Sequence, residues 1–385
     1  MRRLLLLTSS IVLVDTVFFT ALTPLLPHYA HDLGLGKTGA GVLFAGYPAG
    51  CFVGAIPSGL LAGRLGAKAT VLVGVVTAAV CILVFGLAGA PWELDAARFV
   101  QGIASAFSWT GALVWLVVET PVERRGFVIG AAFGAAAGGA LVGPLVGGIA
   151  SVAGIAATFV TLAALSLVVA LWAVVTPTQQ PEGPQPLMSL LDAARDPDMR
   201  LAAWFTVLPG LLFGSLGVLA PLRLSALGAG AVAISAVFLG GAALETVSNT
   251  VLGRVSDRVG PVAPLLVGLA ASIVVALLLP WPGERFGLAA LIVVAGPCFA
   301  AFFTPGMTLL THLSERRGLS LGYAFTLVSL AWAPGEALGA AGSGALAGAT
   351  SDAVPYLLLA GACALTLVLL WRRRVSIGSL AVEER

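Results

Sequence analysis

Three acidic residues lie inside long apolar runs of the sequence: Asp15, Glu245 and Glu336. If these runs cross a membrane, each charge costs several kcal/mol, so each acid is a candidate functional residue. In surroundings of low dielectric, a carboxylic acid can take up a proton near neutral pH, and its ionised form can bind an organic cation instead. Competition between a proton and a cation for one carboxylate is sufficient to exchange one for the other.

Two other polar residues accompany the acids. Asn249 lies four residues after Glu245, so the two share a face if the segment is helical. Arg98 lies near the start of another apolar run and is a second kind of candidate for the site. Alternatively, its side chain extends to water at the membrane surface. We expect no pair between Arg98 and Gln101.

The alternative role of the acids is structural. In that case Asp15 or Glu336 is neutralised by Arg98 or Arg223, and neither acid exchanges a proton or a substrate. The residue types alone leave both alternatives open.

The composition excludes several classes of protein. Of the 385 residues, 59% are hydrophobic and 10% are charged, whereas a soluble domain carries about 25% charged residues. A soluble protein of this length could not cover its surface with so few charges. The net charge of +2 gives no electrostatic reason to bind a polyanion, so we expect no nucleic-acid partner.

Motifs of catalysis, metal binding and nucleotide binding are missing from the sequence. It contains no G-x-x-x-x-G-K-[ST], no H-E-x-x-H and no G-x-S-x-G. The four cysteines lie in apolar runs without paired spacing or a neighbouring His: Cys51, Cys81, Cys298 and Cys363. We therefore expect no cofactor, no metal site and no enzymatic activity.

Twelve apolar segments have the length of about 20 residues that a bilayer requires. They are 5–27, 39–62, 69–89, 95–118, 127–149, 154–175, 201–222, 231–252, 262–281, 286–311, 319–346 and 353–371. The sequence thus predicts an all-α membrane protein with twelve transmembrane helices.

Basic residues indicate the orientation, because they concentrate on the cytoplasmic side of a membrane protein. With both termini inside, 16 of the 20 Lys and Arg residues fall in inside segments. We therefore predict a multi-pass protein of the inner (plasma) membrane of the cell, with both termini cytoplasmic.

A polar stretch, residues 176–200, follows the sixth segment and contains five prolines. Its composition is typical of a linker, and part of it, 187–195, is expected to form a short helix at the membrane surface. The predicted domains are a six-helix bundle over 1–175, this cytoplasmic linker, a second bundle over 201–371 and a cytoplasmic tail over 372–385.

Two loops of the first half recur in the second. The sequence GLLAGRLGAK (59–68) is matched by GRVSDRVGP (253–261), at an offset of 194. The sequence ERRGFVIG (123–130) is matched by ERRGLSLG (315–322), at an offset of 192. Two independent matches at nearly one offset predict parallel repeats, related by an axis along the membrane normal.

This arrangement resembles the major facilitator superfamily over essentially the whole chain. The family's loop G-x-x-x-D-R-x-G-R-K/R is matched by Gly59, Arg64, Gly66 and Lys68, and its second copy by Gly253, Asp257, Arg258 and Gly260. The resemblance implies that these residues form gating loops. Gly63 stands where the family has Asp, which predicts weaker closure of the cytoplasmic side.

A glycine-rich segment, GALVGPLVGG (139–148), resembles the family's antiporter motif. The matching residues are Gly139, Gly143, Pro144, Gly147 and Gly148. Glycines at helical spacing form a groove for another helix, and Pro144 bends its own helix. The resemblance implies export in exchange for protons; the alternative is tight packing with no bearing on direction.

The segment DTVFFTALTPLLPHY (15–29) resembles the first span of the vesicular amine transporters and related bacterial drug:proton antiporters. That resemblance implies that Asp15 meets the ammonium group of a substrate, although Thr16 replaces the branch's Asn. The segment RFVQG (98–102) resembles a family motif implicated in proton coupling. Four aromatic residues would line a cavity suited to cations: Phe18, Phe19, Trp109 and Trp332.

We therefore predict a secondary active transporter that exports small amphipathic, cationic compounds in exchange for protons by alternating access. Its partners would be the small-molecule substrate, protons and the lipid bilayer, and we expect a monomer. The predicted substrate and proton site consists of Asp15, Arg98, Glu245, Asn249 and Glu336. The alternative function is an uptake symporter or facilitator for a sugar or an organic anion, which would require a more basic or polar cavity.

Overall fold

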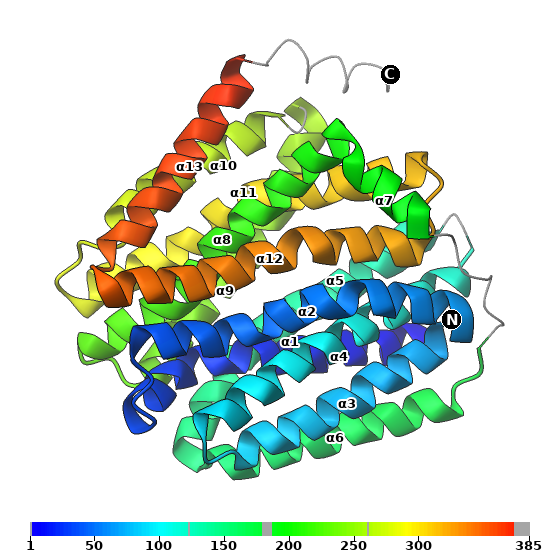
Figure 1. Cartoon of the computed structure of the whole chain (residues 1–385), viewed down its shortest axis with the longest axis horizontal. Helices are drawn as coiled ribbons and strands as arrows, with labels where there is room; N and C mark the ends of the chain where they lie inside the picture. The colour runs from blue at the N-terminus through cyan, green and yellow to red at the C-terminus, as the bar shows by residue number, and fades with distance from the viewer. Residues whose placement is uncertain (1, 122–123, 179–186, 260–261, 373–385) are drawn as a thin grey trace.

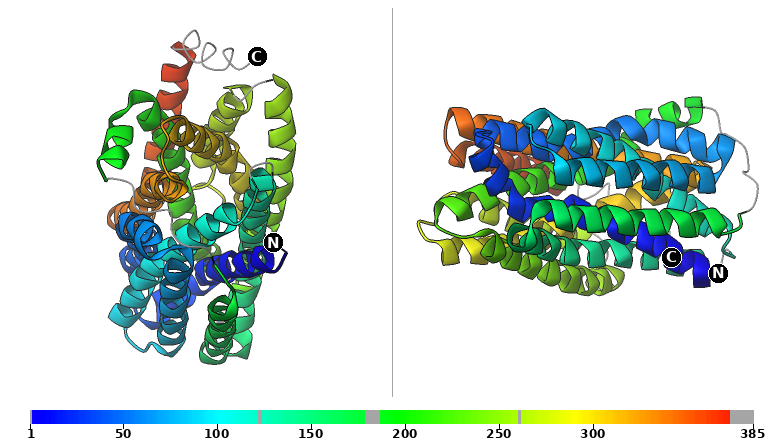
Figure 2. Two further views of the ribbon diagram at one scale, coloured as in Figure 1. Left: turned by 90° about the vertical axis from the view of Figure 1, so that its right-hand side faces the viewer. Right: turned by 90° about the horizontal axis from the view of Figure 1, so that it is seen from below.

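The computed structural model describes residues 2–121, 124–178, 187–259 and 262–372. These residues form helices, most of which run side by side along the long axis of the molecule, whereas α13 is inclined to them (Figures 1 and 2). The helices are α1 (Arg2–Asp32), α2 (Gly36–Leu65), α3 (Ala67–Leu87), α4 (Pro91–Val118), α5 (Arg125–Ala153), α6 (Ile155–Val175), α7 (Leu187–Arg195), α8 (Pro197–Ala226), α9 (Ala231–Val259), α10 (Val262–Leu278), α11 (Arg285–Arg316), α12 (Leu321–Ala349) and α13 (Ala353–Arg372).

Each predicted apolar segment coincides with one helix, and most helices are longer than the prediction. The first segment, predicted over 5–27, lies within α1, which begins at Arg2 and ends at Asp32. Hydropathy marks only the part of a helix that is apolar, whereas backbone hydrogen bonds continue the helix into polar residues. Among the described residues, ten helices are long and apolar enough to cross a membrane. The twelve predicted spans exceed that number.

Helix α8 begins inside the predicted linker, 176–200. The helix expected in this linker forms as α7, but α8 already begins at Pro197. Asp196 caps the start of α8. Its Oδ1 accepts hydrogen bonds from the backbone amides of Asp198 (2.7 Å) and Met199 (3.1 Å). Proline favours the first position of a helix, so the sequence Asp196–Pro197 starts α8 within the predicted linker.

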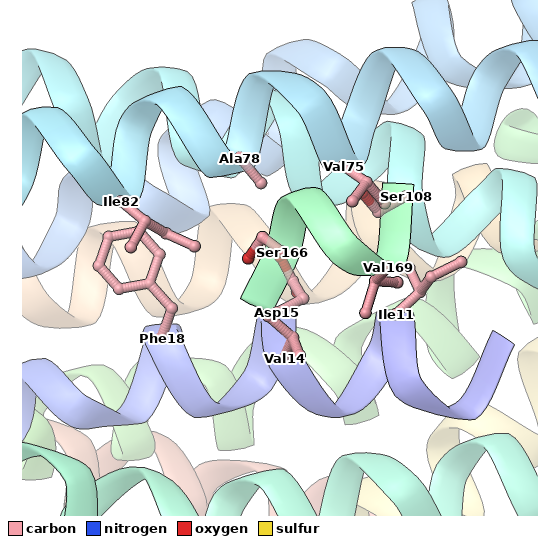
Figure 3. A pocket seen from close by; sticks show the side chains of 10 residues that line it. All are labelled: Ile11, Val14, Asp15, Phe18, Val75, Ala78, Ile82, Ser108, Ser166 and Val169. Atoms are coloured by element: carbon pink, nitrogen blue, oxygen red, sulfur yellow. The ribbon is translucent and has the colours of Figure 1, made fainter. Parts of the chain in front are cut away.

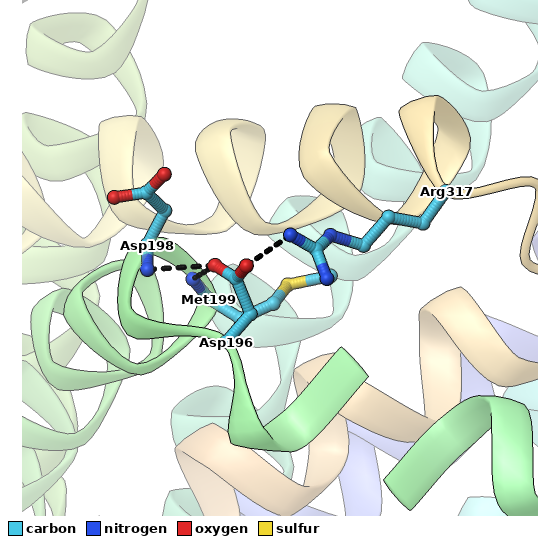
Figure 4. A network of polar contacts seen from close by, with 4 residues as sticks. All are labelled: Asp196, Asp198, Met199 and Arg317. Atoms are coloured by element: carbon cyan, nitrogen blue, oxygen red, sulfur yellow. Dashed lines mark hydrogen bonds and ion pairs between the residues drawn. The ribbon is translucent and has the colours of Figure 1, made fainter. Parts of the chain in front are cut away.

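The same Asp196 joins α8 to the end of α11. Its Oδ2 accepts a hydrogen bond from the Arg317 guanidinium (Figure 4). Partial burial favours the neutral acid, but the amides of Met199 and Asp198 and the positive charge of Arg317 outweigh it, so the pKa of Asp196 lies below its ordinary value.

Helices pack mainly with partners from their own half of the chain. In the first half, α3 packs against α4 and α6, α2 against α4, and α1 against α5. In the second half, α11 packs against α8, α9 and α10, and α12 against α8. The two halves meet chiefly where α2 packs against α12 and α5 against α9.

The contact between α2 and α12 extends along both helices. At one end, the Lys37 ammonium lies 2.6 Å from the Asp352 carboxylate, just beyond α12. Further along α2, a Cβ on Gly41 would lie 2.7 Å from the Ala340 carbonyl oxygen, so these backbones touch. At the opposite end, Thr326 donates a hydrogen bond to the Ala55 carbonyl oxygen (3.1 Å). The two halves are therefore in contact at both ends of this pair.

The contact between α5 and α9 includes Gly148, near the end of α5. A Cβ on Gly148 would lie 2.6 Å from the Ser235 hydroxyl of α9. At the other end of α5, Gly126, Gly130 and Gly134 have no neighbouring atom within 4 Å of such a Cβ. Near Gly148, α5 therefore packs against the second half, while toward Arg125 its buried residues, Val128 and Ala132, belong to the core of the first half.

Candidate substrate and proton site

Asp15 lies in the middle of α1 and is buried, with an exposed fraction of 6%. Its Oδ2 atom accepts hydrogen bonds from Ser105 Oγ (2.7 Å), Trp109 Nε1 (2.9 Å) and the Tyr47 hydroxyl (3.0 Å). The Tyr47 and Ser105 oxygens are themselves 2.6 Å apart. The other carboxylate oxygen, Oδ1, is buried and has no hydrogen-bond partner among the described residues.

Glycines bring the Asp15 partners together. Ser105 and Trp109 are one turn apart on α4 and so face α1 together. A Cβ on Gly102 of α4 would lie 1.9 Å from the Tyr47 carbonyl oxygen of α2, and no side chain other than hydrogen fits there. This close approach of two backbones places the Tyr47 hydroxyl beside Ser105.

A small cavity lies beside Asp15, between α1, α3, α4 and α6 (Figure 3). It has room for about one water molecule. Its polar lining comes from Asp15, Ser108 and Ser166, and the remaining lining is apolar. The cavity is too small for an organic substrate.

Arg98 is fully buried on α4, which contradicts the alternative that it extends to water. Its guanidinium donates to Gln101 Oε1 (2.8 Å) and to the Phe19 carbonyl oxygen (3.5 Å). It also lies 5.3 Å from the centre of the Tyr47 ring, 5.7 Å from that of Phe19 and 5.8 Å from that of Phe18. The expectation that Gln101 does not pair with Arg98 is wrong, because residues three apart on a helix are neighbours.

Glu336 comes to the same region from α12. Its exposed fraction is 4%, and its Oε2 atom is buried without a partner among the described residues. Trp332, one turn earlier, lies edge-on to Phe19 and Tyr47, with ring centres 6.3 and 6.5 Å apart. The described residues include no ion pair between Arg98 or Arg223 and either Asp15 or Glu336. The structural alternative therefore does not take the form of a direct ion pair, although the charge of Arg98 is close enough to interact with both acids.

Glu245 and Asn249 lie apart from this group. Both are on α9, and Glu245 faces α11, where a Cβ on Gly296 would lie 3.2 Å from its Oε2 atom. The Asn249 Oδ1 atom is buried and has no partner among the described residues. Neither residue has a hydrogen bond or an ion pair to the Asp15 group.

Three of the four aromatic residues predicted to line a cavity lie close to Asp15 or to Tyr47, and the cavity itself stays a prediction. Phe19 stacks on Tyr47 at 4.4 Å between ring centres and contacts Trp332, and Trp109 donates to Asp15. Phe18 packs against Phe85 and Phe159 and lines the small cavity beside Asp15.

Sequence reasoning missed Tyr47 and Ser105. Both are ordinary polar residues in apolar segments, and their spacing from Asp15 carries no signal. The available clue was the number of glycines in both segments, including Gly46 and Gly50 near Tyr47 and Gly102 before Ser105. Glycines indicate a close approach of helices but do not say which helices approach.

The antiporter-type motif packs against α1. Cβ atoms on Gly139, Gly143 and Gly147 would lie less than 3 Å from the Leu13, Val17 and Ala21 carbonyl oxygens, respectively. Pro144 lies within the same continuous helix, α5. The motif therefore lies directly against the helix that carries Asp15. Gly148 faces the other way, toward α9.

The first gating-type loop is described and the second is not. Gly66 separates α2 from α3 with a positive φ of 87°, which favours glycine. Lys68 donates to the Val174 and Thr176 carbonyl oxygens, both at 2.7 Å, while Arg64 is exposed and Gly59 packs against Thr326. The predicted second copy, with Gly253, Asp257, Arg258 and Gly260, lies outside the residues whose side chains the structure describes.

Among the described residues, no group of three His, Cys, Asp or Glu side chains could hold a metal ion. The polar groups of the site are instead suited to hydrogen bonding and charge interaction with a small molecule.

Comparison with known families identifies the chain. Its sequence matches the Major Facilitator Superfamily over residues 8–335 and again over 210–384. The chain belongs to the major facilitator superfamily. It is therefore a multi-pass membrane transporter and not an enzyme. No curated protein matches its sequence significantly.

Solved structures of several transporters have a similar fold. A nucleoside transporter, NupG, has a TM-score of 0.75 and 16% identity, over 96% of this chain and 99% of that chain. A POT family transporter in complex with a thioalcohol-conjugated peptide has a TM-score of 0.77 and 12% identity, over 97% and 96%. A bacterial homologue of the human lysosomal transporter Spinster, inward-facing and unoccupied, has a TM-score of 0.74 and 17% identity, over 95% and 94%. At these identities the likeness concerns the fold alone.

Proposed function

We propose that this superfamily member exports small amphipathic, cationic organic compounds in exchange for protons by alternating access. The observation that carries the proposal is Asp15, a buried carboxylate with three donors on one oxygen and no partner on the other. The free oxygen is available to an ammonium group, and a proton on the carboxylate competes with that group because it removes the negative charge.

The charges and rings around Asp15 support a cationic substrate. With both Asp15 and Glu336 ionised, the single positive charge of Arg98 leaves the group with one net negative charge. Phe19, Tyr47 and Trp332 supply aromatic faces that favour an organic cation. An uptake symporter for an organic anion would require the opposite balance of charge.

The remaining parts of the proposal concern the whole chain. We propose twelve spans, from α1 to α6 and from α8 to α13, as two pseudo-symmetric six-helix bundles joined by a cytoplasmic linker. Both termini would be cytoplasmic, in the inner (plasma) membrane. The supporting observations are the loop repeats and the 16 of 20 basic residues that fall on one side in this topology.

The test of the function is Asp15→Asn in proteoliposomes. The amide keeps the shape and hydrogen bonding of the side chain but cannot exchange a proton. We expect counterflow of a panel of organic cations to lose its dependence on a pH gradient, and binding of those cations to weaken and become independent of pH. The matched control is Asp32→Asn, at the exposed end of the same helix, which should behave as the wild type.

Two results would contradict the proposal. A folded Asp15→Asn protein with wild-type drive and wild-type pH dependence would remove Asp15 from the mechanism and direct attention to Glu245 and Glu336. A panel in which only sugars or organic anions exchange would support the uptake function instead.

A further inference from the structure

Three oxygen atoms around Asp15 lie within hydrogen-bond distance of one another. Asp15 Oδ2 is 2.7 Å from Ser105 Oγ and 3.0 Å from the Tyr47 hydroxyl oxygen, and the two hydroxyl oxygens are 2.6 Å apart. Each hydroxyl group carries one hydrogen atom. When Asp15 is protonated on Oδ2, its proton is the third hydrogen of this triangle, and when Asp15 is ionised only two hydrogens remain.

A neutral Asp15 satisfies the triangle. Three hydrogens then serve three contacts, and each of the three groups donates once and accepts once around a ring. Trp109 Nε1 can only donate, and it adds a further hydrogen bond to Oδ2 (2.9 Å) in either state.

An ionised Asp15 leaves the triangle one hydrogen short. Both hydroxyl groups then turn their hydrogens toward the carboxylate, because hydrogen bonds to a charged acceptor are the stronger ones. The Tyr47 and Ser105 oxygens would face each other with lone pairs only, at 2.6 Å. They repel at that distance, so one of the two side chains has to move.

The backbone packing favours movement of the Tyr47 ring. Cβ atoms on Gly50 and Gly102 would each lie 1.9 Å from a carbonyl oxygen of the facing helix, so α2 and α4 are already in backbone contact at this level. The Tyr47 ring stacks on Phe19 and lies near Trp332 of α12. A displaced ring would therefore press on the second half of the molecule.

We infer that Tyr47 is a positioning residue that transmits the protonation state of Asp15 to α12. The inference rests on the proposed function, in which Asp15 exchanges its proton with solvent during transport. When the proton leaves, the Tyr47 ring is displaced toward Phe19 and Trp332, and the contact between α2 and α12 changes.

The other charged and titratable groups around Asp15 are few. Cys51 of α2, Arg98 of α4 and Glu336 of α12 lie close enough to interact with it or with one another. On the other sides, α3 faces the cavity beside Asp15 with Val75, Ala78 and Ile82. Residues 126–153 and 155–175, in α5 and α6, contain no ionisable side chain. Substitutions that remove the hydroxyl group of Tyr47 or of Ser105 leave these three groups unchanged.

The decisive variants are Tyr47→Phe, which keeps the ring, and Ser105→Ala, which keeps Tyr47. Either change removes the hydrogen deficit, because only one hydroxyl group then remains beside an ionised Asp15. The matched control is Tyr29→Phe, which removes a buried hydroxyl group of α1 that has no hydrogen-bond partner among the described residues.

Two readouts separate coupling from binding. The first is the change, between acid and alkaline pH, of the distance between spin labels at exposed positions of α2 and α12, such as Val53 and Leu338. The second is proton-driven flux beside the pH dependence of substrate binding. We expect both Tyr47→Phe and Ser105→Ala to reduce the distance change by at least half and the flux at least tenfold, while binding stays pH-dependent. Tyr29→Phe should match the wild type.

The infrared carbonyl band of protonated Asp15, identified by its loss in Asp15→Asn, gives an independent signature. It should move to higher frequency in Tyr47→Phe and Ser105→Ala, because each variant removes a hydrogen bond of the ring, and it should stay unchanged in Tyr29→Phe. Wild-type distance changes and flux in both variants, with pH dependence still lost in Asp15→Asn, would overturn the role of Tyr47 alone. Wild-type behaviour of Asp15→Asn would overturn the proposed function. If one variant fails to fold, the other carries the test.

Discussion

Four buried side chains of the central region each keep one polar atom without a hydrogen-bond partner among the described residues: Asp15 Oδ1, Arg98 Nε, Gln101 Nε2 and Glu336 Oε2. An unsatisfied buried polar group costs about 1–3 kcal/mol. Native proteins rarely tolerate such groups unless a ligand or water completes them. Their concentration on α1, α4 and α12 provides this region with polar atoms that can bind a small molecule or water.

Asp196 allows a prediction at the level of one residue, outside the membrane. Its pKa is lower in the folded protein than in the unfolded chain. The stabilisation is therefore fully present above the unfolded value of about 3.9 and is lost as the pH falls through the folded value. We expect the unfolding temperature in detergent to fall more steeply below about pH 4 in the wild type than in Asp196→Asn.

Substitution of Asp196 by Asn removes the negative charge but keeps a side-chain oxygen that can cap α8. Asparagine caps a helix as well as aspartate does, so Asp196→Asn should retain the start of α8, whereas Asp196→Ala should lose about 1 kcal/mol at all pH values. Asp192→Asn, on the exposed surface of α7, is the matched control. Equal pH dependence in the wild type and Asp196→Asn would contradict the prediction.

At the level of a single helix, glycines allow close approach to a neighbouring helix. The packing of α5 against α1 allows this role to be tested. A Cβ on Gly147 would lie 2.3 Å from the Ala21 carbonyl oxygen of α1, whereas one on Gly138 would meet only Leu13 Cδ1, at 3.8 Å. Gly147→Ala should therefore push α5 from α1 and cost about 1–3 kcal/mol. Gly138→Ala should be neutral or stabilising by up to about 1 kcal/mol.

The measurement for this pair of variants is the unfolding temperature together with transport. Because α1 carries Asp15, we expect Gly147→Ala to reduce proton-driven flux as well as stability. Equal effects of the two substitutions would show that close packing of α5 against α1 is not required.

At the scale of the molecule, the two contacts between the halves differ in extent. The pair α2 and α12 is in contact from Lys37–Asp352 to Ala55–Thr326, and this contact is more extensive than the one between α5 and α9. Alternating access requires contacts between the halves to form and break in turn. The α2–α12 contact, beside Tyr47, is the one that a proton on Asp15 could influence directly.

Topology supplies the prediction for the whole chain. A single cysteine placed within residues 176–186, in a protein whose four native cysteines are replaced, should react with impermeant thiol reagents only from the cytoplasmic side. Reaction from outside in intact cells would reverse the orientation inferred from the basic residues. A cysteine at Gly89, between α3 and α4, is the matched control and should react only from outside.

The sequence by itself determined the elements and the family. Apolar runs of membrane length are a local property, so each predicted segment coincides with a helix, and the loop motifs led to the superfamily that the comparison confirmed. It also identified Asp15, Arg98 and Glu336 as polar residues in apolar surroundings, because that contrast is visible in one segment at a time. It placed helix ends poorly, as at Pro197, because polar residues can continue a helix.

Only the tertiary structure decided which of these residues meet. The hydrogen bonds to Asp15 span 32, 90 and 94 residues of sequence, and they depend on the glycines that let α2 and α4 approach. Glu245 also lies in an apolar segment, but its side chain contacts α11. Arg98 donates a hydrogen bond to Gln101 and lies beside aromatic rings. Such contacts follow from how helices rotate and pack against one another, and the apolar pattern of a membrane helix leaves that rotation undetermined.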